Sequence, residues 1–390
     1  MLETIAKESE SDVATYDGQV LAFEVSVLTQ LIVDAGMIRP MLVVDRRAVN
    51  AAGVRNEIDA VTAWDERIFD GTEPNPSADL ARSAIDAANR VGADGLIAVG
   101  GGSCIDLAKA MAIGLDCRND VDAVFRGASA IHGATPIIAV PTTAGSGSQA
   151  TSFGVLYVKG CKRSLDHPSL RPVAAVLDQR FIESLPSRLS AVSGLDALCQ
   201  CVESIWACGA TDRSRELATQ GGKLMFEHLL SAARDRSPTD CRAIMLGAHL
   251  SGCAINTSRT TAAHAYSYEL TQGYGIPHGL AVAYGLGWLA KWNAGVDADS
   301  CLHPAGPEAA RIYVHDAASV LGVRPEGVSG VMTRLLDTLS LPTSPYSFSV
   351  TITDLPRLAQ SIEPTRLSNN PRQLTIDDIR RCTERSFTSE

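Results

Sequence analysis

The sequence predicts a doubly wound α/β domain over residues 1–186, followed by an all-α domain over residues 187–390. In the first part, short apolar runs are each followed by a small-residue turn and a helical pattern, which is typical of a parallel sheet flanked by helices. In the second part, nearly every segment repeats its apolar residues with the period of an α-helix. A chain of 390 residues also exceeds the usual size of a single hydrophobic core.

The strands of the first domain are expected to be short, apolar and bounded by turn residues, over 40–45, 96–99, 136–140, 152–158 and 173–177. The expected helices of this domain cover 74–91 and 104–115. Strand, turn and helix recur in this order, which favours the doubly wound arrangement. Pro186 marks the end of the part that contains strands.

The second domain is expected to be helical from about residue 189, with breaks at 237–238, 275–277, 304–307 and 341–342. One of its helical patterns is expected to begin at 194–200, GLDALCQ. Asp196 and Gln200 are four residues apart there, so they would lie on one helix face.

Composition predicts a cytoplasmic protein that binds neither nucleic acid nor membrane. The net charge is −10, and no Lys/Arg run has interleaved aromatics. The N-terminus, MLETIAKESESD, has neither the basic nor the apolar part of a secretory signal, and no apolar run is long enough to span a bilayer. The ten cysteines are scattered along the chain, which favours reduced thiols.

Two turns are candidates for binding a dinucleotide. Gly100, Gly101, Gly102 and Ser103 join a strand end to a helix start, where backbone N–H groups and the helix dipole favour a pyrophosphate. The second turn, 141–148, offers hydroxyls and amides that could line the same ligand. The alternatives are an ordinary tight turn for the first and a plain loop for the second.

Asp45 indicates which nicotinamide cofactor is favoured. An acid at the end of a strand can accept hydrogen bonds from the adenosine ribose and repel a 2′-phosphate. We therefore expect NAD(H) in preference to NADP(H), although Arg46 and Arg47 follow directly and could attract a 2′-phosphate instead.

Four residues form a candidate metal site: Asp196, Gln200, His264 and His278. A carboxylate, an amide oxygen and two imidazoles suit a borderline divalent ion such as Fe²⁺ or Zn²⁺. Taken singly, each residue has an ordinary alternative: Asp196 as a helix N-cap, Gln200 as a core amide, and the histidines as surface or core residues. Together, the four favour a metal.

The motifs GGGS, PTTAGSGS, GLDAL and HAYSYELTQGYGIPHG resemble those of the iron-containing, group III alcohol dehydrogenases, from about Asp45 to Pro371. The resemblance implies a dehydroquinate synthase-like two-domain architecture, a nicotinamide cofactor, a divalent metal, and interconversion of aldehydes and alcohols. It implies that cofactor contacts fall on the first turn and on Asp106, Thr142, Thr143, Ser146 and Lys162. It implies that Asp196, Gln200, His264 and His278 are the metal ligands.

Three positions depart from the pattern of that family. Gln200 stands where a histidine ligand is usual, and an amide oxygen binds a metal more weakly than imidazole does. Tyr268 stands where many members have a proton-relaying histidine, and its hydroxyl has a much higher ordinary pKa. Gln149 replaces an acidic residue of the second turn.

The same comparison indicates an anionic substrate. Arg259, Thr260 and Thr261 precede His264, and Arg366 lies near the C-terminus, at positions where members acting on simple alcohols have uncharged residues. Two guanidinium groups with hydroxyls suit a phosphonate or carboxylate, although either arginine could instead form a salt bridge. Within the family, these segments look most like the phosphonoacetaldehyde reductase branch, which makes 2-hydroxyethylphosphonate in phosphonate biosynthesis.

The resulting expectation is a metal-assisted, NAD(P)H-dependent reductase of a small anionic aldehyde, with His264 and Tyr268 as catalytic residues and Tyr268 or water supplying the proton. Three alternatives stay open: a short-chain alcohol or polyol dehydrogenase, a dehydroquinate synthase-like lyase, and a non-catalytic dinucleotide-binding protein. A homodimer is compatible with each of them.

Overall fold

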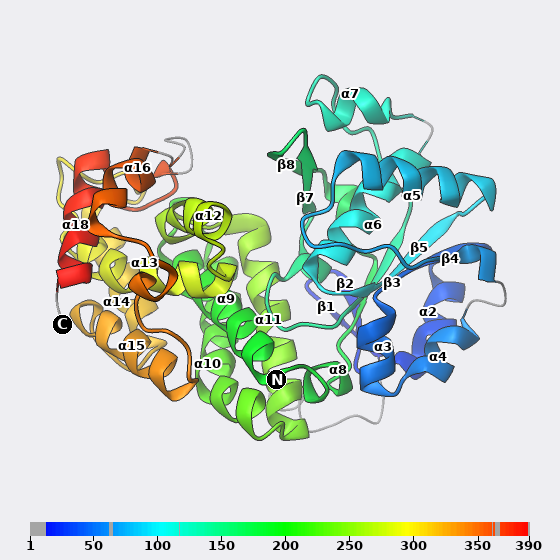
Figure 1. Ribbon diagram of the computed structural model, residues 1–390, viewed down its shortest axis with the longest axis horizontal. Coiled ribbons are helices and arrows are strands. Elements are labelled where there is room, and N and C mark those ends of the chain that lie inside the picture. Colours follow the sequence, from blue (N-terminus) through cyan, green and yellow to red (C-terminus); the bar gives the residue numbers. More distant parts are fainter. Residues whose placement is uncertain (1–12, 62–64, 117, 361, 363–366, 389–390) are drawn as a thin grey trace. The chain divides into compact units, whose positions relative to one another are not determined.

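The computed structural model describes residues 13–61, 65–116, 118–360, 362 and 367–388, which form two compact units (Figure 1). The first unit contains residues up to Leu185 together with Arg236–Gly252, and the second contains Pro186–Asp235 and Cys253–Glu390. The predicted division after residue 186 stays a prediction. The return of Arg236–Gly252 to the first unit differs from the predicted continuous helical domain.

Two contacts explain why Arg236–Gly252 belongs to the first unit. Helix α11 (Pro238–Ser258) begins in the first unit, where the Arg242 guanidinium lies 4.3 Å from the centre of the Phe23 ring. Gly252 also packs against Gly147, whose φ is 65°. A Cβ atom added to Gly252 would come within 2.5 Å of the Gly147 carbonyl oxygen, so this approach requires glycine.

The first unit is built on a seven-stranded sheet with strand order β1-β2-β9-β6-β5-β3-β4, and every neighbouring pair is parallel except β1–β2. The strands are β1 (Val13–Tyr16), β2 (Gln19–Ala22), β3 (Pro40–Val44), β4 (Ile68–Phe69), β5 (Gly95–Gly100), β6 (Ile137–Pro141) and β9 (Ala174–Val176). A separate antiparallel pair is formed by β7 (Phe153–Val158) and β8 (Cys161–Asp166).

Helices cover both faces of the large sheet, as Figure 1 shows. Along β5, Leu96 and Ala98 pack into one core with α5 (Ala78–Arg90) and α6 (Gly102–Leu115). Ile97 and Val99 pack into the other core, with α2 (Leu28–Asp34), α3 (Arg46–Ala52), α4 (Arg55–Ala60) and α8 (Arg180–Glu183). The short α7 (Val121–Phe125) contributes to the first core. Side chains that alternate between two apolar cores explain why these strands are apolar throughout.

The second unit is helical, and its helices are α9 (Ser187–Trp206), α10 (Asp212–Arg234), the end of α11, α12 (Ala262–Tyr274), α13 (His278–Ala294), α14 (Gly306–Ser319), α15 (Val328–Thr338), α16 (Leu355–Gln360) and α18 (Ile376–Thr388). The α/β and all-α fold class predicted from the sequence is confirmed. No helix among the residues the structure describes is long and apolar enough to cross a membrane.

The predicted helix start at 194–200 is wrong. Helix α9 begins at Ser187, directly after Pro186, so Asp196 lies in the helix interior and does not cap it. Gly194 has a packing role instead: a Cβ atom there would come within 2.2 Å of a Leu229 methyl carbon on α10. The sequence pattern was misleading because glycine within a helix looks like a boundary when the neighbouring helix cannot be seen.

Candidate functional site

The two predicted cofactor turns lie beside each other, since they follow the neighbouring parallel strands β5 and β6. The Thr142 amide donates to the Gly100 carbonyl oxygen over 3.1 Å. Gly102 opens α6 so close to the second turn that a Cβ atom there would come within 2.5 Å of the Ser146 hydroxyl. The amides at the start of α6 thus stand at the carboxyl edge of the sheet, where doubly wound domains bind ligands.

The side chains of four other predicted cofactor residues also lie in this unit. Ser103 Oγ accepts a hydrogen bond from the Asn75 amide over 3.2 Å. Thr142 is buried and Thr143 is half-buried within the second turn. Burial raises the pKa of Asp106, and the charge of Lys162, which lies on β8 opposite Tyr157, is one of the smaller effects that oppose this rise.

Asp45 has a local role in the protein. Its carboxylate caps α3 by accepting a hydrogen bond from the Arg47 amide over 3.0 Å. Arg46 is paired with Asp59 at 3.2 Å and with Asp70 at 3.7 Å, while the Arg47 side chain is 88% exposed. Asp45 therefore stands at the carboxyl end of β3, as the ribose interpretation requires, and Arg46 already has acidic partners.

A buried lysine that the sequence analysis did not single out supports the second turn. Lys109 on α6 is fully buried, and its Nζ donates to Ser148 O at 2.8 Å, Thr151 Oγ1 at 2.9 Å and Phe153 O at 2.6 Å. Ser148 Oγ in turn donates to Asp106 Oδ1 over 2.6 Å. The predicted cofactor residue Asp106 thus acts within this network, holding the turn and the edge of β7, whose Val155 amide donates to Asp106 Oδ2 over 3.1 Å.

Three of the four predicted metal ligands converge in the second unit. Asp196 comes from α9, His264 from α12, and His278 is the first residue of α13. One ligand atom from each lies within 4.8 Å of the other two, and His264 Nε2 is 3.2 Å from Asp196 Oδ1. Asp196 and His264 are buried, while the His278 side chain is 36% exposed. This donor set fits a divalent ion such as Fe²⁺ or Zn²⁺.

A glycine beside His278 makes this convergence feasible. A Cβ atom on Gly279 would come within 2.0 Å of the Val192 carbonyl oxygen and 2.8 Å of the Asp196 amide nitrogen, both on α9. Only glycine therefore allows the start of α13 to approach α9 so closely. The pair His278-Gly279 places the imidazole next to Asp196.

Gln200, the fourth predicted ligand, is buried one turn after Asp196 and hydrogen-bonds to the Asp196 carboxylate. Burial alone would raise the pKa of Asp196, but the charges of His278 and His264 and the hydrogen bonds from His264 and Gln200 lower it. The carboxylate is thus held ionised in a site that lies among apolar helices.

Glu203 completes the site and was missed by the sequence analysis. Its side chain is fully buried, and Oε2 forms a hydrogen bond with His264 Nδ1. Oε1 accepts from Thr261 Oγ1 at 2.6 Å and from the amides of Thr261 at 3.1 Å and Ala263 at 2.9 Å. The carboxylate thus accepts hydrogen bonds from amides at the start of α12 that have no partner within the helix. It also fixes the orientation of the imidazole, as carboxylates that hydrogen-bond to metal-binding histidines do.

The charge of Glu203 also affects the protonation of His264. Burial disfavours the imidazolium, but the charge of Glu203 and the hydrogen bonds to Asp196 and Glu203 outweigh it and raise the pKa of His264 to about 10. A sequence signal for Glu203 did exist. Asp196, Gln200 and Glu203 follow one another at helical spacings of four and three residues, as a polar line on an otherwise buried helix.

Tyr268, the predicted proton donor, lies one turn after His264 on α12. Its ring stacks on that of His278, with the ring centres 6.0 Å apart. His264 and His278 themselves meet edge to face, with ring centres 5.5 Å apart. Tyr268 is half-buried, so it stands at the more open side of the histidine pair.

The predicted substrate residues Arg259, Thr260 and Thr261 form the connection between α11 and α12. Arg259 and Thr260 are half-buried. Thr261 has a different role from the one expected: it is buried, its hydroxyl donates to Glu203, and it accepts from Trp206 Nε1 over 3.1 Å. Its hydroxyl proton is already in use within the protein. Arg366 lies outside the described residues.

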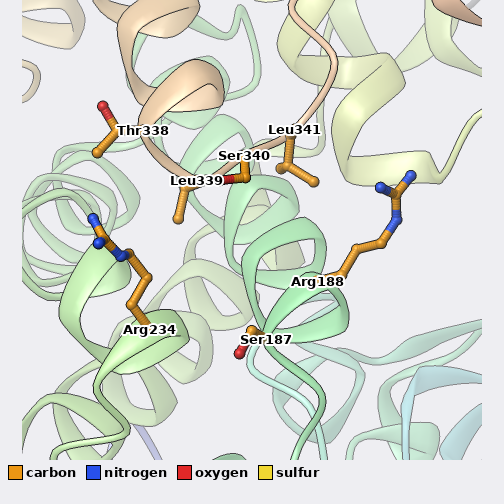
Figure 2. A pocket seen from close by; sticks show the side chains of 7 residues that line it. All are labelled: Ser187, Arg188, Arg234, Thr338, Leu339, Ser340 and Leu341. Carbon is orange, nitrogen blue, oxygen red and sulfur yellow. The ribbon is translucent and has the colours of Figure 1, made fainter.

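A surface pocket of about 390 Å³ lies at the start of α9 and the ends of α10 and α15 (Figure 2). It is lined by Ser187, Arg188, Arg234, Thr338, Leu339, Ser340 and Leu341. None of the candidate cofactor, metal or substrate residues lines this pocket, so its concave shape does not identify it as the candidate active site.

Solved structures define the class of fold. A sulfoacetaldehyde reductase from Bifidobacterium kashiwanohense in complex with NAD⁺ is 23% identical, with a TM-score of 0.85 over 97% of this chain and 99% of that one. An alcohol dehydrogenase from Oenococcus oeni is 23% identical, with a TM-score of 0.83 over 95% of this chain and 100% of that one. The fold is therefore the one that these two structures share.

Sequence comparison gives the family. Residues 22–179 match the model for iron-containing alcohol dehydrogenase, and residues 190–387 match the C-terminal model of the same family. A phosphonoacetaldehyde reductase of Streptomyces viridochromogenes is 34% identical, covering 83% of each chain. A 4-hydroxybutyrate dehydrogenase of Cupriavidus necator is 30% identical, covering 90% of this chain and 93% of its own. The chain belongs to the iron-containing alcohol dehydrogenase family and is an alcohol dehydrogenase or aldehyde reductase.

The family match makes position 200 a test of the metal site. Replacing Gln200 with His is expected to raise the affinity of the protein for Zn²⁺ or Fe²⁺ by roughly an order of magnitude, because imidazole is a stronger ligand than an amide oxygen. Competition with a chromophoric chelator measures this affinity. Gln200→Leu is the matched control and should weaken binding. Equal affinities in all three proteins would show that position 200 does not contribute a ligand.

Proposed function

We propose that this enzyme reduces a small anionic aldehyde with NADH, and that phosphonoacetaldehyde, reduced to 2-hydroxyethylphosphonate, is the substrate that fits best. The observation that carries the proposal is the connection Arg259–Thr261, which places a cationic residue directly before the helix that holds His264. Names of relatives support an anionic substrate. The reductases named for phosphonoacetaldehyde and sulfoacetaldehyde, and the 4-hydroxybutyrate dehydrogenase, each take a compound with an acidic group.

In this proposal the cofactor pyrophosphate binds at Gly100–Ser103 and beside Thr142, Thr143 and Ser146, with the network of Asp106 and Lys109 holding the second turn. Lys162 adds a positive charge in the same unit. Asp45 at the end of β3 favours the ribose of NAD(H), because Arg46 is already paired with Asp59 and Asp70.

Asp196, Gln200, His264 and His278 would hold the divalent ion. When bound, the ion supplies a Lewis acid for the aldehyde oxygen and the reduced nicotinamide supplies the hydride. Glu203 keeps one proton of His264 on Nδ1, so Nε2, which faces Asp196, is the nitrogen that would give up its proton and bind the ion. Tyr268, stacked on His278, supplies the proton to the oxygen, and Arg259 orients the substrate through its acidic group.

The direct test follows NADH or NADPH oxidation by near-ultraviolet absorbance, with phosphonoacetaldehyde beside propanal, after chelation and with added Fe²⁺ or Zn²⁺. Faster turnover of phosphonoacetaldehyde, restored by metal, supports the proposal. Other relatives are named lactaldehyde reductase and methanol dehydrogenase, and their uncharged compounds favour a second candidate, a short-chain alcohol dehydrogenase. Faster turnover of propanal would select that candidate.

Replacing Arg259 with Ala is expected to raise KM for phosphonoacetaldehyde about 10- to 100-fold relative to KM for propanal, because a charge-assisted hydrogen bond is lost. Steady-state kinetics with both aldehydes measure the change. Arg259→Lys keeps the positive charge but lacks the planar guanidinium group. Its KM for phosphonoacetaldehyde, relative to KM for propanal, should lie between the values of wild type and Arg259→Ala. A parallel rise in both KM values would remove Arg259 from substrate recognition.

A further inference from the structure

Arg259 has an unusual backbone conformation. It follows the last residue of α11 with φ of 59°, in the left-handed region that favours glycine. An L-residue with a long side chain is disfavoured there, and such conformations persist only where the surroundings impose them. A glycine would fit this position at lower cost, so the conformation of Arg259 depends on the contacts that hold its backbone.

The conformation is held by a residue from the far end of the chain. Asn369 Nδ2 donates to the Ser258 carbonyl oxygen over 2.8 Å and to the Thr260 carbonyl oxygen over 2.9 Å. These two carbonyls flank Arg259 on either side. The Asn369 carboxamide thus joins the two ends of the turn. Its oxygen, Oδ1, accepts a hydrogen bond from the Gly209 amide over 2.9 Å.

The rest of the turn is fixed as well. Ser258 Oγ donates to the Arg259 carbonyl oxygen over 3.0 Å, and the Thr261 amide donates to Glu203, which also holds His264. The Asn369 backbone is anchored in turn, because its carbonyl oxygen accepts from the Cys208 amide over 2.9 Å. The backbone around Arg259 is therefore hydrogen-bonded to Asn369 and, through the Thr261 amide, to Glu203, which also holds the candidate metal ligand His264.

We propose that Asn369 is a positioning residue for substrate specificity: by locking Arg259 in the left-handed conformation, it fixes the guanidinium for the acidic group of the substrate. The inference rests on the proposed function of Arg259. It goes beyond that function by assigning the selectivity for anionic aldehydes to a carboxamide that need not contact the substrate. Charged substrates are sensitive to small displacements of their partner, so loosening this turn affects them most.

The experiment compares Asn369→Ala with a matched control in the other unit. Asn119 uses its carboxamide in the same way, donating to Ile113 O at 3.0 Å and Gly133 O at 2.9 Å and accepting from the His132 amide at 2.7 Å. Asn369→Ala is expected to raise KM for phosphonoacetaldehyde about 10-fold relative to KM for propanal. Asn119→Ala should leave that ratio within about twofold of wild type, because additivity holds for independent sites.

A double-mutant cycle separates positioning from general stability. Arg259→Gly suits the left-handed conformation, so its Tm should not fall, while the preference for phosphonoacetaldehyde should be lost. In the Arg259→Gly background, Asn369→Ala should then change the ratio of KM values less than about twofold. Equal losses for both aldehydes in Asn369→Ala, or the same ratio change in both backgrounds, would overturn the inference. Wild-type enzyme without a preference for phosphonoacetaldehyde would instead overturn the proposed function itself.

Discussion

Replacing Glu203 with Gln is expected to weaken the binding of Zn²⁺ or Fe²⁺ about 10- to 100-fold. The carboxylate accepts the proton of His264 Nδ1, so Nε2, beside Asp196, is the nitrogen that would lose its proton to bind a metal. A glutamine that turns its NH₂ group toward Nδ1 would favour the tautomer with the proton on Nε2, which cannot bind a metal. Turned the other way, its NH₂ group would face the amides of Thr261 and Ala263, which are donors themselves.

Metal affinity measured by chelator competition, together with the Tm of the metal-free protein, tests this prediction. Glu269→Gln is the matched control, because Glu269 also lies on α12 but pairs with Arg357 at 2.7 Å and is partly exposed. Glu203→Asp is a second variant that keeps the charge while shortening its reach. If Glu203→Gln binds metal as tightly as wild type does, then Glu203 does not control the tautomer of His264.

Replacing Lys109 with Met is expected to lower the free energy of unfolding by about 3–5 kcal/mol, because removal of one partner leaves a buried charge uncompensated. Asp106 would lose the positive charge that most opposes the rise of its pKa on burial, and the carbonyl oxygens of Ser148 and Phe153 would each lose a donor. The candidate cofactor turn 141–148 should loosen as well, and if it binds the cofactor as proposed, binding of NADH should weaken. Denaturant unfolding and fluorescence titration with NADH measure the two effects.

The titration of Lys109 should also make the stability of the protein depend on pH. Burial lowers the pKa of Lys109 to about 8 from its ordinary 10.5, although Asp106 and Asp166 oppose the shift. Between these values the unfolded chain binds a proton that the folded protein has released, so stability should rise with pH in that window. The rise should be absent in Lys109→Met and present in the control Lys291→Met, whose lysine is exposed. Parallel pH profiles for wild type and Lys109→Met would contradict the assignment.

The parts of the site that the sequence predicted are those with local signals. The glycine turn between β5 and α6 can be found from the adjacent strand, turn and helix patterns, and the two histidines of the candidate metal site from a recognisable motif. Lys109, Glu203 and Asn369 have partners 39–44, 58–61 and 109–160 residues away, respectively. Their sequence neighbours do not indicate these contacts, since a buried charge on a helix resembles a surface charge until its partner is known.

Errors in the predicted elements have a similar origin. The strands β1 and β2 are short and follow a polar N-terminus, so they do not stand out as apolar runs. The helix start at Gly194 was wrong because the close approach of Leu229 cannot be seen from α9 alone. Propensity and periodicity describe a segment by itself, whereas these features depend on what packs against it.

The return of residues Arg236–Gly252 to the first unit has a consequence for how the protein is made. Because that unit is assembled from two separate stretches of chain, it is incomplete until residue 252 has left the ribosome. By then α9 and α10 of the second unit have already been synthesised. The first unit can therefore be completed only after α9 and α10 have been made, and a gene truncated after Leu185 would encode a sheet without the segment that packs through Gly252 against Gly147.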